Sequence, residues 1–390
     1  MAAPCPSRFP QPCNEALSSS DAALVAARAA QLRYVNDLQP GITRIPTRNG
    51  FVYRNPDGSM VKGSQELTRI KAIAVPPAWT DVWICVHANG HIQATGRDAR
   101  GRKQYRYHPR WRSVRDQAKY EHILSFGSVL PSIRRRVAAD LAKPGLPREK
   151  VLAAVVCLME RTLARVGNPE YARQNESFGL TTLKNRHVQI RAGRIELDFR
   201  AKSGTHHHSV VSDRKLARIL KNCRDLPGSE LFQYIGEDGE QHKVESGDIN
   251  EYLRAAAGRD ITAKDFRTWA ATNLAVVALH RLAEKKPTNR GLVQAIKEVA
   301  QQLGNTPAVC RKSYIHPAVF DTYLQGGLRM KLASTDTESY VPEMWAIERQ
   351  VLGFLRTWIS GSGSQQTLKV ALKRSIKIAR GQSQGAATRV

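Results

Sequence analysis

The segment that most constrains the interpretation of this chain reads Gly304-Asn305-Thr306-Pro307-Ala308-Val309-Cys310-Arg311-Lys312-Ser313-Tyr314. Two arginine segments precede it, Arg165-Val166-Gly167-Asn168 and Lys264-Asp265-Phe266-Arg267, and between them a strand-turn pattern ends in Phe199-Arg200-Ala201-Lys202-Ser203-Gly204. A tyrosine preceded by cationic residues combines a nucleophile with groups that can hold a phosphodiester without a metal. The candidate residues, in chain order, are Arg165, Lys202, Arg267, Asn305 and Tyr314.

Composition favours a polyanionic partner. The 390 residues are 42% hydrophobic, which is enough for two domains with their own cores. Lys and Arg number 60 against 34 Asp and Glu, a net charge of +26. Such an excess predicts nucleic-acid binding that weakens steeply with salt. Charge alone fits a non-enzymatic binding protein equally well, so the motifs must decide between the two.

The cysteines and the apolar residues indicate an intracellular, soluble protein. The six cysteines show no C-x-x-C spacing, so we expect reduced thiols and neither disulfides nor a zinc site. The start of the sequence lacks a basic region followed by an apolar stretch, and no apolar run approaches the roughly 18 residues of a membrane span. The cysteines are Cys5, Cys13, Cys85, Cys157, Cys223 and Cys310.

The N-terminal part predicts an extension over residues 1–30 and a small antiparallel sheet domain over residues 31–113. Ser20-Asp21 can cap a helix over residues 22–33. Phe51-Val52-Tyr53-Arg54 leads into the turn Asn55-Pro56-Asp57-Gly58, and two β-type runs flank Asn89-Gly90. Asn-Gly between such runs is a strong hairpin signal.

Residues 117–330 predict a mainly α domain that carries a three-stranded sheet, so the fold class is α+β. Apolar residues at helical spacing predict a helix that ends near Gly167. Strands are expected over residues 178–183, 187–190 and 194–199, with a turn at 202–204 toward 207–211. The helical residues are Leu152, Val155, Val156, Met159 and Leu163.

Residues 331–390 predict a C-terminal helix and a basic tail. Ser360-Gly361-Ser362-Gly363-Ser364 reads as a flexible linker, and no acidic residue follows Glu348. The tail fits both a helix formed on DNA and a solvated disordered segment. Its basic residues include Lys369, Lys373, Arg374, Lys377 and Arg380.

Over most of residues 38–330 the sequence resembles the type IB DNA topoisomerases, specifically their poxvirus-like and bacterial branch. Two N-terminal segments share in the resemblance: Ile73-Ala74-Val75-Pro76-Pro77-Ala78-Trp79-Thr80-Asp81-Val82-Trp83-Ile84 and Gly96-Arg97-Asp98-Ala99-Arg100-Gly101-Arg102-Lys103-Gln104-Tyr105-Arg106-Tyr107-His108. The resemblance implies the fold shared by tyrosine recombinases and type IB topoisomerases. It also implies relaxation of supercoiled duplex DNA through a transient 3′-phosphotyrosyl bond, strand rotation and religation, without ATP, a cofactor or an obligatory metal.

The resemblance gives each candidate residue a role. Tyr314 is the nucleophile, Lys202 is the general acid for the leaving 5′-oxygen, and Arg165 and Arg267 hold the non-bridging oxygens. Asn305 stands where the poxvirus pattern has histidine, so it can donate a hydrogen bond but not transfer a proton. Its segment, rich in turn-forming residues, also fits a simple turn.

A second group of residues is expected to bind DNA. Arg102 and Lys103 suit phosphates, and the resemblance places Gln104, Tyr105 and Tyr107 in the major groove. Tyr171, the last residue of this group, lies in the segment after Arg165 that resembles the family's first arginine motif. No metal site is expected at residues 206–208, three consecutive histidines that alternate faces on a strand without a carboxylate or cysteine cluster. They are expected to lie near DNA.

Two alternatives stay open. Tyrosine recombinases share the Arg–Lys–Arg–Tyr order, but their second arginine usually follows a histidine in a His-x-x-Arg pattern, and Lys264 occupies that position here. A nucleoid-binding protein explains the charge but not the ordered constellation. We therefore expect a topoisomerase of the bacterial cytoplasm, located at the nucleoid, that acts as a monomer and closes as a clamp around double-stranded DNA.

Overall fold

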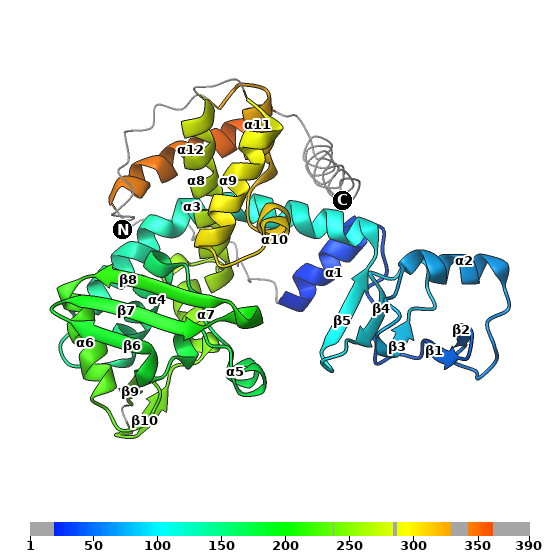
Figure 1. The fold of residues 1–390 in the computed structure, drawn as a ribbon, viewed down its shortest axis with the longest axis horizontal. Coiled ribbons are helices and arrows are strands. Elements are labelled where there is room, and N and C mark those ends of the chain that lie inside the picture. Colours follow the sequence, from blue (N-terminus) through cyan, green and yellow to red (C-terminus); the bar gives the residue numbers. More distant parts are fainter. Residues whose placement is uncertain (1–18, 237, 284–286, 329–341, 362–390) are drawn as a thin grey trace, which may run out of the picture. The chain divides into compact units, whose positions relative to one another are not determined.

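The computed structural model describes residues 19–236, 238–283, 287–328 and 342–361 (Figure 1). The chain packs as two compact units, Met1–Lys119 (unit 1) and Tyr120–Val390 (unit 2), and helix α3 (Pro109–Ala142) runs from one into the other. Residues 1–18 of the predicted N-terminal extension and the basic tail lie outside the described residues. Within them, every cysteine is a free thiol, and no helix is long and apolar enough to cross a membrane.

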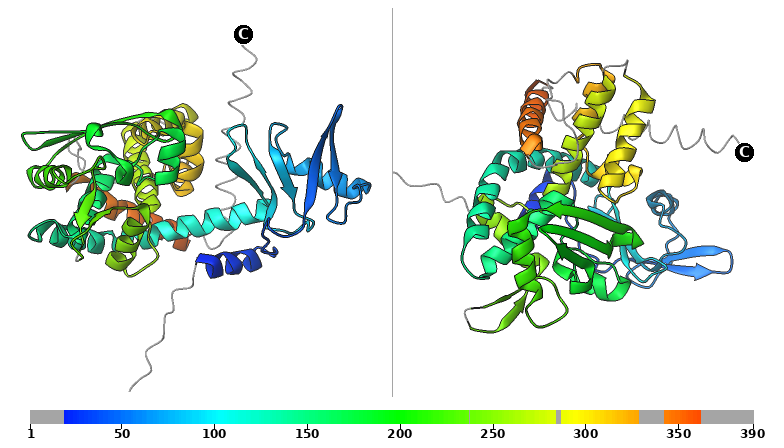
Figure 2. Two further views of the ribbon diagram at one scale, coloured as in Figure 1. Left: turned by 90° about the horizontal axis from the view of Figure 1, so that it is seen from below. Right: turned by 60° about the vertical axis from the view of Figure 1, so that its left-hand side comes forward.

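Unit 1 is built on a five-stranded antiparallel sheet in the order β2-β1-β3-β4-β5 (Figure 2). The hairpin predicted across Asn89-Gly90 is confirmed, because β3 and β4 pair with Ile84 opposite Ala94. The elements of this unit are α1 (Ser19–Ala29), β1 (Ile42–Thr47), β2 (Gly50–Arg54), α2 (Ser64–Ile73), β3 (Thr80–Ile84), β4 (Ile92–Arg97) and β5 (Lys103–Tyr107).

The first helix is shorter than predicted. The sequence predicts a helix to Arg33, but α1 ends at Ala29. Gln31 adopts a left-handed backbone conformation with φ of 55°, and Arg33 then forms a β-bridge with Gly90. The alanine-rich segment thus ends where the chain begins to pair with the loop between β3 and β4.

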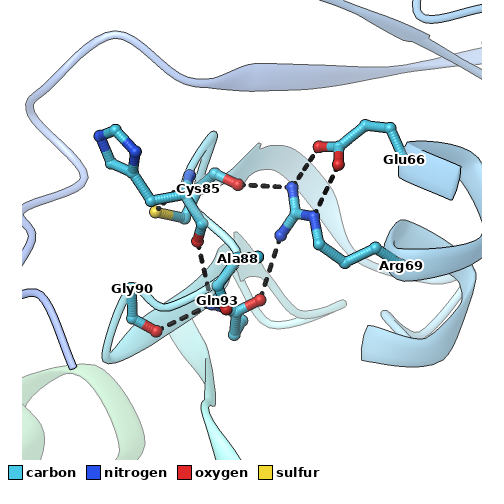
Figure 3. A network of polar contacts seen from close by, with 7 residues as sticks. Glu66, Arg69, Cys85, Ala88, Gly90 and Gln93 are labelled. Carbon is cyan, nitrogen blue, oxygen red and sulfur yellow. Dashed lines mark hydrogen bonds and ion pairs between the residues drawn. The ribbon is translucent and has the colours of Figure 1, made fainter. Parts of the chain in front are cut away.

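A polar network holds that loop in place (Figure 3). Arg69 of α2 forms an ion pair with Glu66 and donates to the carbonyl of Cys85 at 2.7 Å. It also donates to Oε1 of Gln93 at 3.1 Å. Gln93 donates in turn from Nε2 to loop carbonyls, including that of Gly90 at 2.8 Å. Loop carbonyls that are partly or fully buried thereby gain donors.

Unit 2 is mainly helical and contains the predicted three-stranded sheet, in the antiparallel order β6-β7-β8. One face of β7 is buried through Ile195, Leu197 and Phe199, and helices α4 and α6 contact the sheet (Figure 1). The strands are β6 (Val188–Arg191), β7 (Arg194–Arg200), β8 (His206–Ser212), β9 (Gln233–Ile235) and β10 (Gln241–Lys243). The remaining α-helices are α4 (Arg148–Thr162), α5 (Pro169–Asn175), α6 (Arg214–Arg224), α7 (Ser246–Ala257), α8 (Ala263–Ala283), α9 (Asn289–Gln302), α10 (Pro307–Ser313), α11 (Pro317–Leu324) and α12 (Pro342–Gly361). Short 3-10 turns are η1 (Leu180–Thr182), η2 (Asn185–His187) and η3 (Lys202–Gly204).

Two predictions for unit 2 are wrong. The segment predicted as a strand over residues 178–183 instead contains the turn η1, because Leu180 and Thr181 donate their N–H groups to the loop after α4 and only Phe178 donates to a strand, at Arg200 of β7. The helix predicted to end near Gly167 ends at Thr162, where Leu163 turns left-handed with φ of 55°. The hairpin of β9 and β10 was not predicted.

The C-terminal helix α12 is part of the core of unit 2. Arg134 of α3 forms ion pairs with Glu160 at 2.5 Å and with Glu348 of α12 at 2.7 Å. Trp269 of α8 donates from its indole nitrogen to Glu348 at 3.0 Å. One carboxylate therefore ties α12 to α3 and α8. The apolar side chains that α12 buries are Ile347, Val351 and Leu355.

We expect Gln93→Ala to destabilise unit 1 by about 1–3 kcal/mol, because loop carbonyls lose their donor in a site that water does not reach easily. Amide hydrogen exchange in β3 and β4 should accelerate accordingly, while exchange in α8 of unit 2 should not change. Gln65→Ala, at an exposed position of α2, is the matched control. Equal protection of β3 and β4 in both variants would contradict a stabilising role for the network.

Candidate active site

The backbone around Arg165 is fixed by close contact between two loop segments. Leu180 of η1 donates its N–H to the carbonyl of Arg165 at 2.9 Å. Gly167 adopts φ of 108°, a conformation that side chains disfavour. A Cβ added to Gly179 would lie 2.6 Å from the carbonyl oxygen of Arg165 and from the backbone of Gly167. Gly167 and Gly179 therefore allow the loop after α4 to lie close to the segment before η1, and this contact positions Arg165.

Arg267 on α8 is only 4% exposed, and its guanidinium group joins two helix ends. It donates to the carbonyl of Leu163, and at 2.6 Å to that of Leu303. These carbonyls lie at the C-terminal ends of α4 and α9, where carbonyls lack intrahelical partners and carry partial negative charge. Burial and the nearby charge of Arg165 lower the pKa of Arg267 to about 10, so it stays charged at neutral pH. The loops that start at these two ends carry Arg165 and Asn305.

Asn305 lies in a turn, as its turn-forming neighbours predict, and its side chain also contacts Arg165. Arg165 donates from Nη2 to the side-chain Oδ1 of Asn305 at 2.5 Å. This contact leaves the Nδ2 of Asn305 as a donor, and within the described part of the chain that buried atom has no partner. The same is true of Nε of Arg267. A guanidinium nitrogen and an amide nitrogen, both buried and unpaired, suit an oxyanion.

Tyr314 caps the end of α10 and is half-buried beside Arg267. The guanidinium carbon of Arg267 lies 5.4 Å from the centroid of the Tyr314 ring. The Tyr314 N–H donates to Cys310 at 3.0 Å, and its carbonyl accepts from Thr272 of α8 at 3.3 Å. Burial alone would raise the pKa of the Tyr314 phenol, but the charges of Arg267 and Arg165 outweigh burial and lower it. The site thus stabilises the phenolate relative to that of a free tyrosine.

Lys202 occupies a different position. It begins η3, the exposed turn between β7 and β8, in which Ser203 and Gly204 have φ of 66° and 76°. Its ammonium nitrogen lies 6.0 Å from the ring centroid of Tyr171 on α5. Direct contacts therefore join Arg165 to Asn305 and Arg267 to Tyr314, and Arg267 also binds the helix ends that precede Arg165 and Asn305. Lys202 instead contacts Tyr171.

The three consecutive histidines separate onto two faces of β8. His206 and His208 are exposed, and His206 lies 2.6 Å from a carboxylate oxygen of Asp198. His207 is half-buried, and burial together with the charges of Arg267 and Arg165 lowers its pKa to about 4. The sequence predicted that all three histidines lie near DNA and did not distinguish His207, although strand alternation could have singled it out. Among the described residues, no group of His, Cys, Asp and Glu side chains could hold a metal ion.

In unit 1, the polar residues expected to bind DNA lie on or next to β5. Arg102 pairs with Asp98 at 2.7 Å, and Lys103 pairs with Asp37 at 2.6 Å. Gln104 donates to Asp98 at 2.9 Å. A phosphate that bound here would compete with these two carboxylates.

The tyrosines of β5 form an aromatic surface. The rings of Tyr105 and Tyr107 stack with centroids 5.8 Å apart and an interplanar angle of 8°. Tyr105 is 40% exposed, and the ammonium nitrogen of Lys103 lies 5.7 Å from its ring centroid. A flat ring beside a cation suits contact with bases and the phosphate backbone.

Comparison with known proteins defines the class of this enzyme. Residues 108–338 match the family "Eukaryotic DNA topoisomerase I, catalytic core", and residues 50–98 match "Bacterial DNA topoisomerase IB, N-terminal domain". DNA topoisomerase 1B of Acanthamoeba polyphaga mimivirus is 33% identical over 296 residues, which cover 73% of this chain and 88% of that protein. DNA topoisomerase 1B of Vaccinia virus (strain Copenhagen) is 23% identical over 267 residues, covering 65% and 80%. The chain therefore belongs to the type IB DNA topoisomerases.

We expect Gly179→Ala to slow plasmid relaxation roughly 10²-fold or more, because a misplacement of about 1 Å in a catalytic group can cost that much. The new methyl group would meet backbone atoms, which cannot rotate away, so the Arg165 loop must shift. Gly247→Ala is the control, since a Cβ there meets nothing within 4 Å. Relaxation by Gly179→Ala at the rate of this control would contradict the proposed coupling to Arg165.

Proposed function

We propose that this topoisomerase cleaves one strand of duplex DNA by attack of Tyr314 on a phosphodiester. The phenolate oxygen forms a bond to phosphorus, the 5′-oxygen leaves, and a 3′-phosphotyrosyl link results. The free end rotates, and its 5′-hydroxyl then attacks the link and restores the strand. The observation that carries this proposal is the placement of Tyr314 against the buried guanidinium of Arg267, which with Arg165 lowers the pKa of the phenol.

Arg165, Arg267 and Asn305 bind the non-bridging oxygens in this proposal. Negative charge grows on those oxygens as phosphorus becomes pentacoordinate, so preorganised donors stabilise the transition state more than the ground state. Arg267 has both terminal nitrogens on backbone carbonyls, which leaves Nε for the substrate. Asn305 offers Nδ2, because its Oδ1 accepts from Arg165.

Lys202 protonates the leaving 5′-oxygen in this proposal. An alkoxide is a poor leaving group, so a general acid is needed. Support comes from the position of Lys202 on the turn that leads into β8, since His207 of the same strand lies within the electrostatic reach of Arg165 and Arg267. The exposed ammonium group is accessible to a bound strand.

The enzyme is further inferred to be a monomer that closes as a clamp around double-stranded DNA in the bacterial nucleoid. Its net charge of +26, its two compact units and its match to a bacterial N-terminal domain support this inference. The chemistry needs neither ATP nor a cofactor, because the phosphotyrosyl bond conserves the energy of the broken ester.

The residues proposed to contact DNA are Arg102, Lys103, Gln104, Tyr105, Tyr107 and Tyr171.

Relaxation of a supercoiled plasmid in the presence of a chelator tests the proposed function. The wild-type enzyme should relax both signs of supercoiling and leave a covalent adduct when denatured during reaction. Tyr314→Phe should bind duplex DNA but form no adduct, because only the nucleophilic oxygen is lost. Tyr234→Phe, on β9, should behave as wild type. An adduct formed by Tyr314→Phe would overturn the assignment of the nucleophile.

A substrate with sulfur at the scissile 5′-bridging position tests Lys202. A thiol has a pKa near ~8.5, far below that of an alcohol, so a thiolate leaves without protonation. Lys202→Ala should cleave ordinary DNA at least ~10²-fold more slowly but recover most of its rate on the sulfur substrate. Arg165→Ala should not recover comparably if it acts on the non-bridging oxygens. Equal recovery of both variants, or none for Lys202→Ala, would remove Lys202 from the role of general acid.

A further inference from the structure

His207 lies within electrostatic reach of Arg267 and Arg165 and has no role in the reaction proposed above. It lies on β8 directly opposite Phe199 of β7. The two rings pack with centroids 4.9 Å apart and an interplanar angle of 36°. Phe199 is buried in the core of unit 2, so this contact holds the imidazole ring against a rigid element. His206 and His208, on either side, are exposed and lie near the carboxylate of Asp198.

One imidazole nitrogen of His207 lacks a partner. Its Nε2 is buried and makes no hydrogen bond within the part of the chain that the structure describes. Nε of Arg267 and Nδ2 of Asn305 are in the same condition. Unsatisfied buried polar atoms are rare in proteins and cost free energy, so several around one site indicate a missing binding partner. The shared partner that suits a guanidinium and an amide N–H is an anionic oxygen.

The charge state of His207 fits this position. Arg267 and Arg165 both act on it, and with burial they lower its pKa to about 4, so the ring is neutral at neutral pH. A neutral imidazole still carries one N–H donor. It adds a donor without the repulsion that a third cation beside Arg165 and Arg267 would bring.

We propose that His207 is a further catalytic residue, whose Nε2–H donates a hydrogen bond to a non-bridging oxygen of the scissile phosphate. This inference rests on the proposed function, because it assumes that the phosphodiester binds at Arg165 and Arg267. No bond to His207 forms or breaks, and the ring keeps its proton throughout. Its contribution grows with the negative charge on the phosphate oxygens.

Single-turnover cleavage at saturating enzyme gives the first test. His207→Phe keeps a ring to pack on Phe199 but removes the donor, so cleavage should slow roughly 10²-fold with little loss of DNA affinity. His207→Gln, which has an amide donor, should recover part of that loss. His242→Phe, the same substitution on β10, is the matched control and should cleave at nearly the wild-type rate. Cleavage by His207→Phe at the rate of this control would overturn the inference.

Sulfur substitution of each non-bridging oxygen separates contact from a structural effect. Sulfur accepts hydrogen bonds poorly, so it should slow the wild-type enzyme at the oxygen that His207 contacts. In His207→Phe, sulfur at that one oxygen should cause a clearly smaller loss than in the wild type, whereas the loss at the other oxygen should be unchanged. Equal sulfur effects in both enzymes at both oxygens would overturn the proposed contact. A wild-type enzyme that forms no adduct would instead overturn the proposed function itself.

Discussion

The buried guanidinium of Arg267 is the interaction on which the rest of the site depends. Burial of a charge is costly unless hydrogen bonds compensate for it. Here the compensation comes from the last carbonyls of two helices, at Leu163 and Leu303. The loops that follow these residues carry Arg165 and Asn305, which then hydrogen-bond to each other across 140 positions of sequence. The same side chain lies against the ring of Tyr314. A single cation thus sets the positions of three other residues.

The free site is electrostatically incomplete. Burial and then repulsion from Arg165 lower the pKa of Arg267, and no carboxylate among the described residues forms an ion pair with either arginine. Elsewhere in unit 2 the buried cation Arg134 is fully paired with Glu160 and Glu348. Functional sites commonly violate rules of stability that the rest of a fold obeys. The phosphodiester would supply the missing negative charge, so substrate binding should also stabilise unit 2.

Some features could be read from the sequence and others could not. Alternation along residues 194–199 predicted β7, and Asn89-Gly90 predicted the hairpin of β3 and β4, because both signals are local. The segment 178–183 misled the prediction, since its Phe, Leu and Thr residues suit a strand while the N–H groups of Leu180 and Thr181 pair with the loop after α4. Leu163 continues the apolar period of α4, yet the helix stops before it. The order of the candidate residues was visible, but their contacts and the place of His207 depend on tertiary packing.

The ion pair between Glu348 of α12 and Arg134 of α3 has a consequence for folding during synthesis. Glu348 meets its partner Arg134 across 214 positions of sequence, and the apolar side of α12 completes the core around α8. During synthesis, Tyr314 and both arginines leave the ribosome before this helix does. Until α12 docks, Arg134 has Glu160 but lacks its second partner, Glu348, and part of the core stays open to water. Contacts between distant positions also slow folding, because a long loop must close first. A nascent chain that already carries all five candidate residues therefore still lacks the helix that completes the core of unit 2.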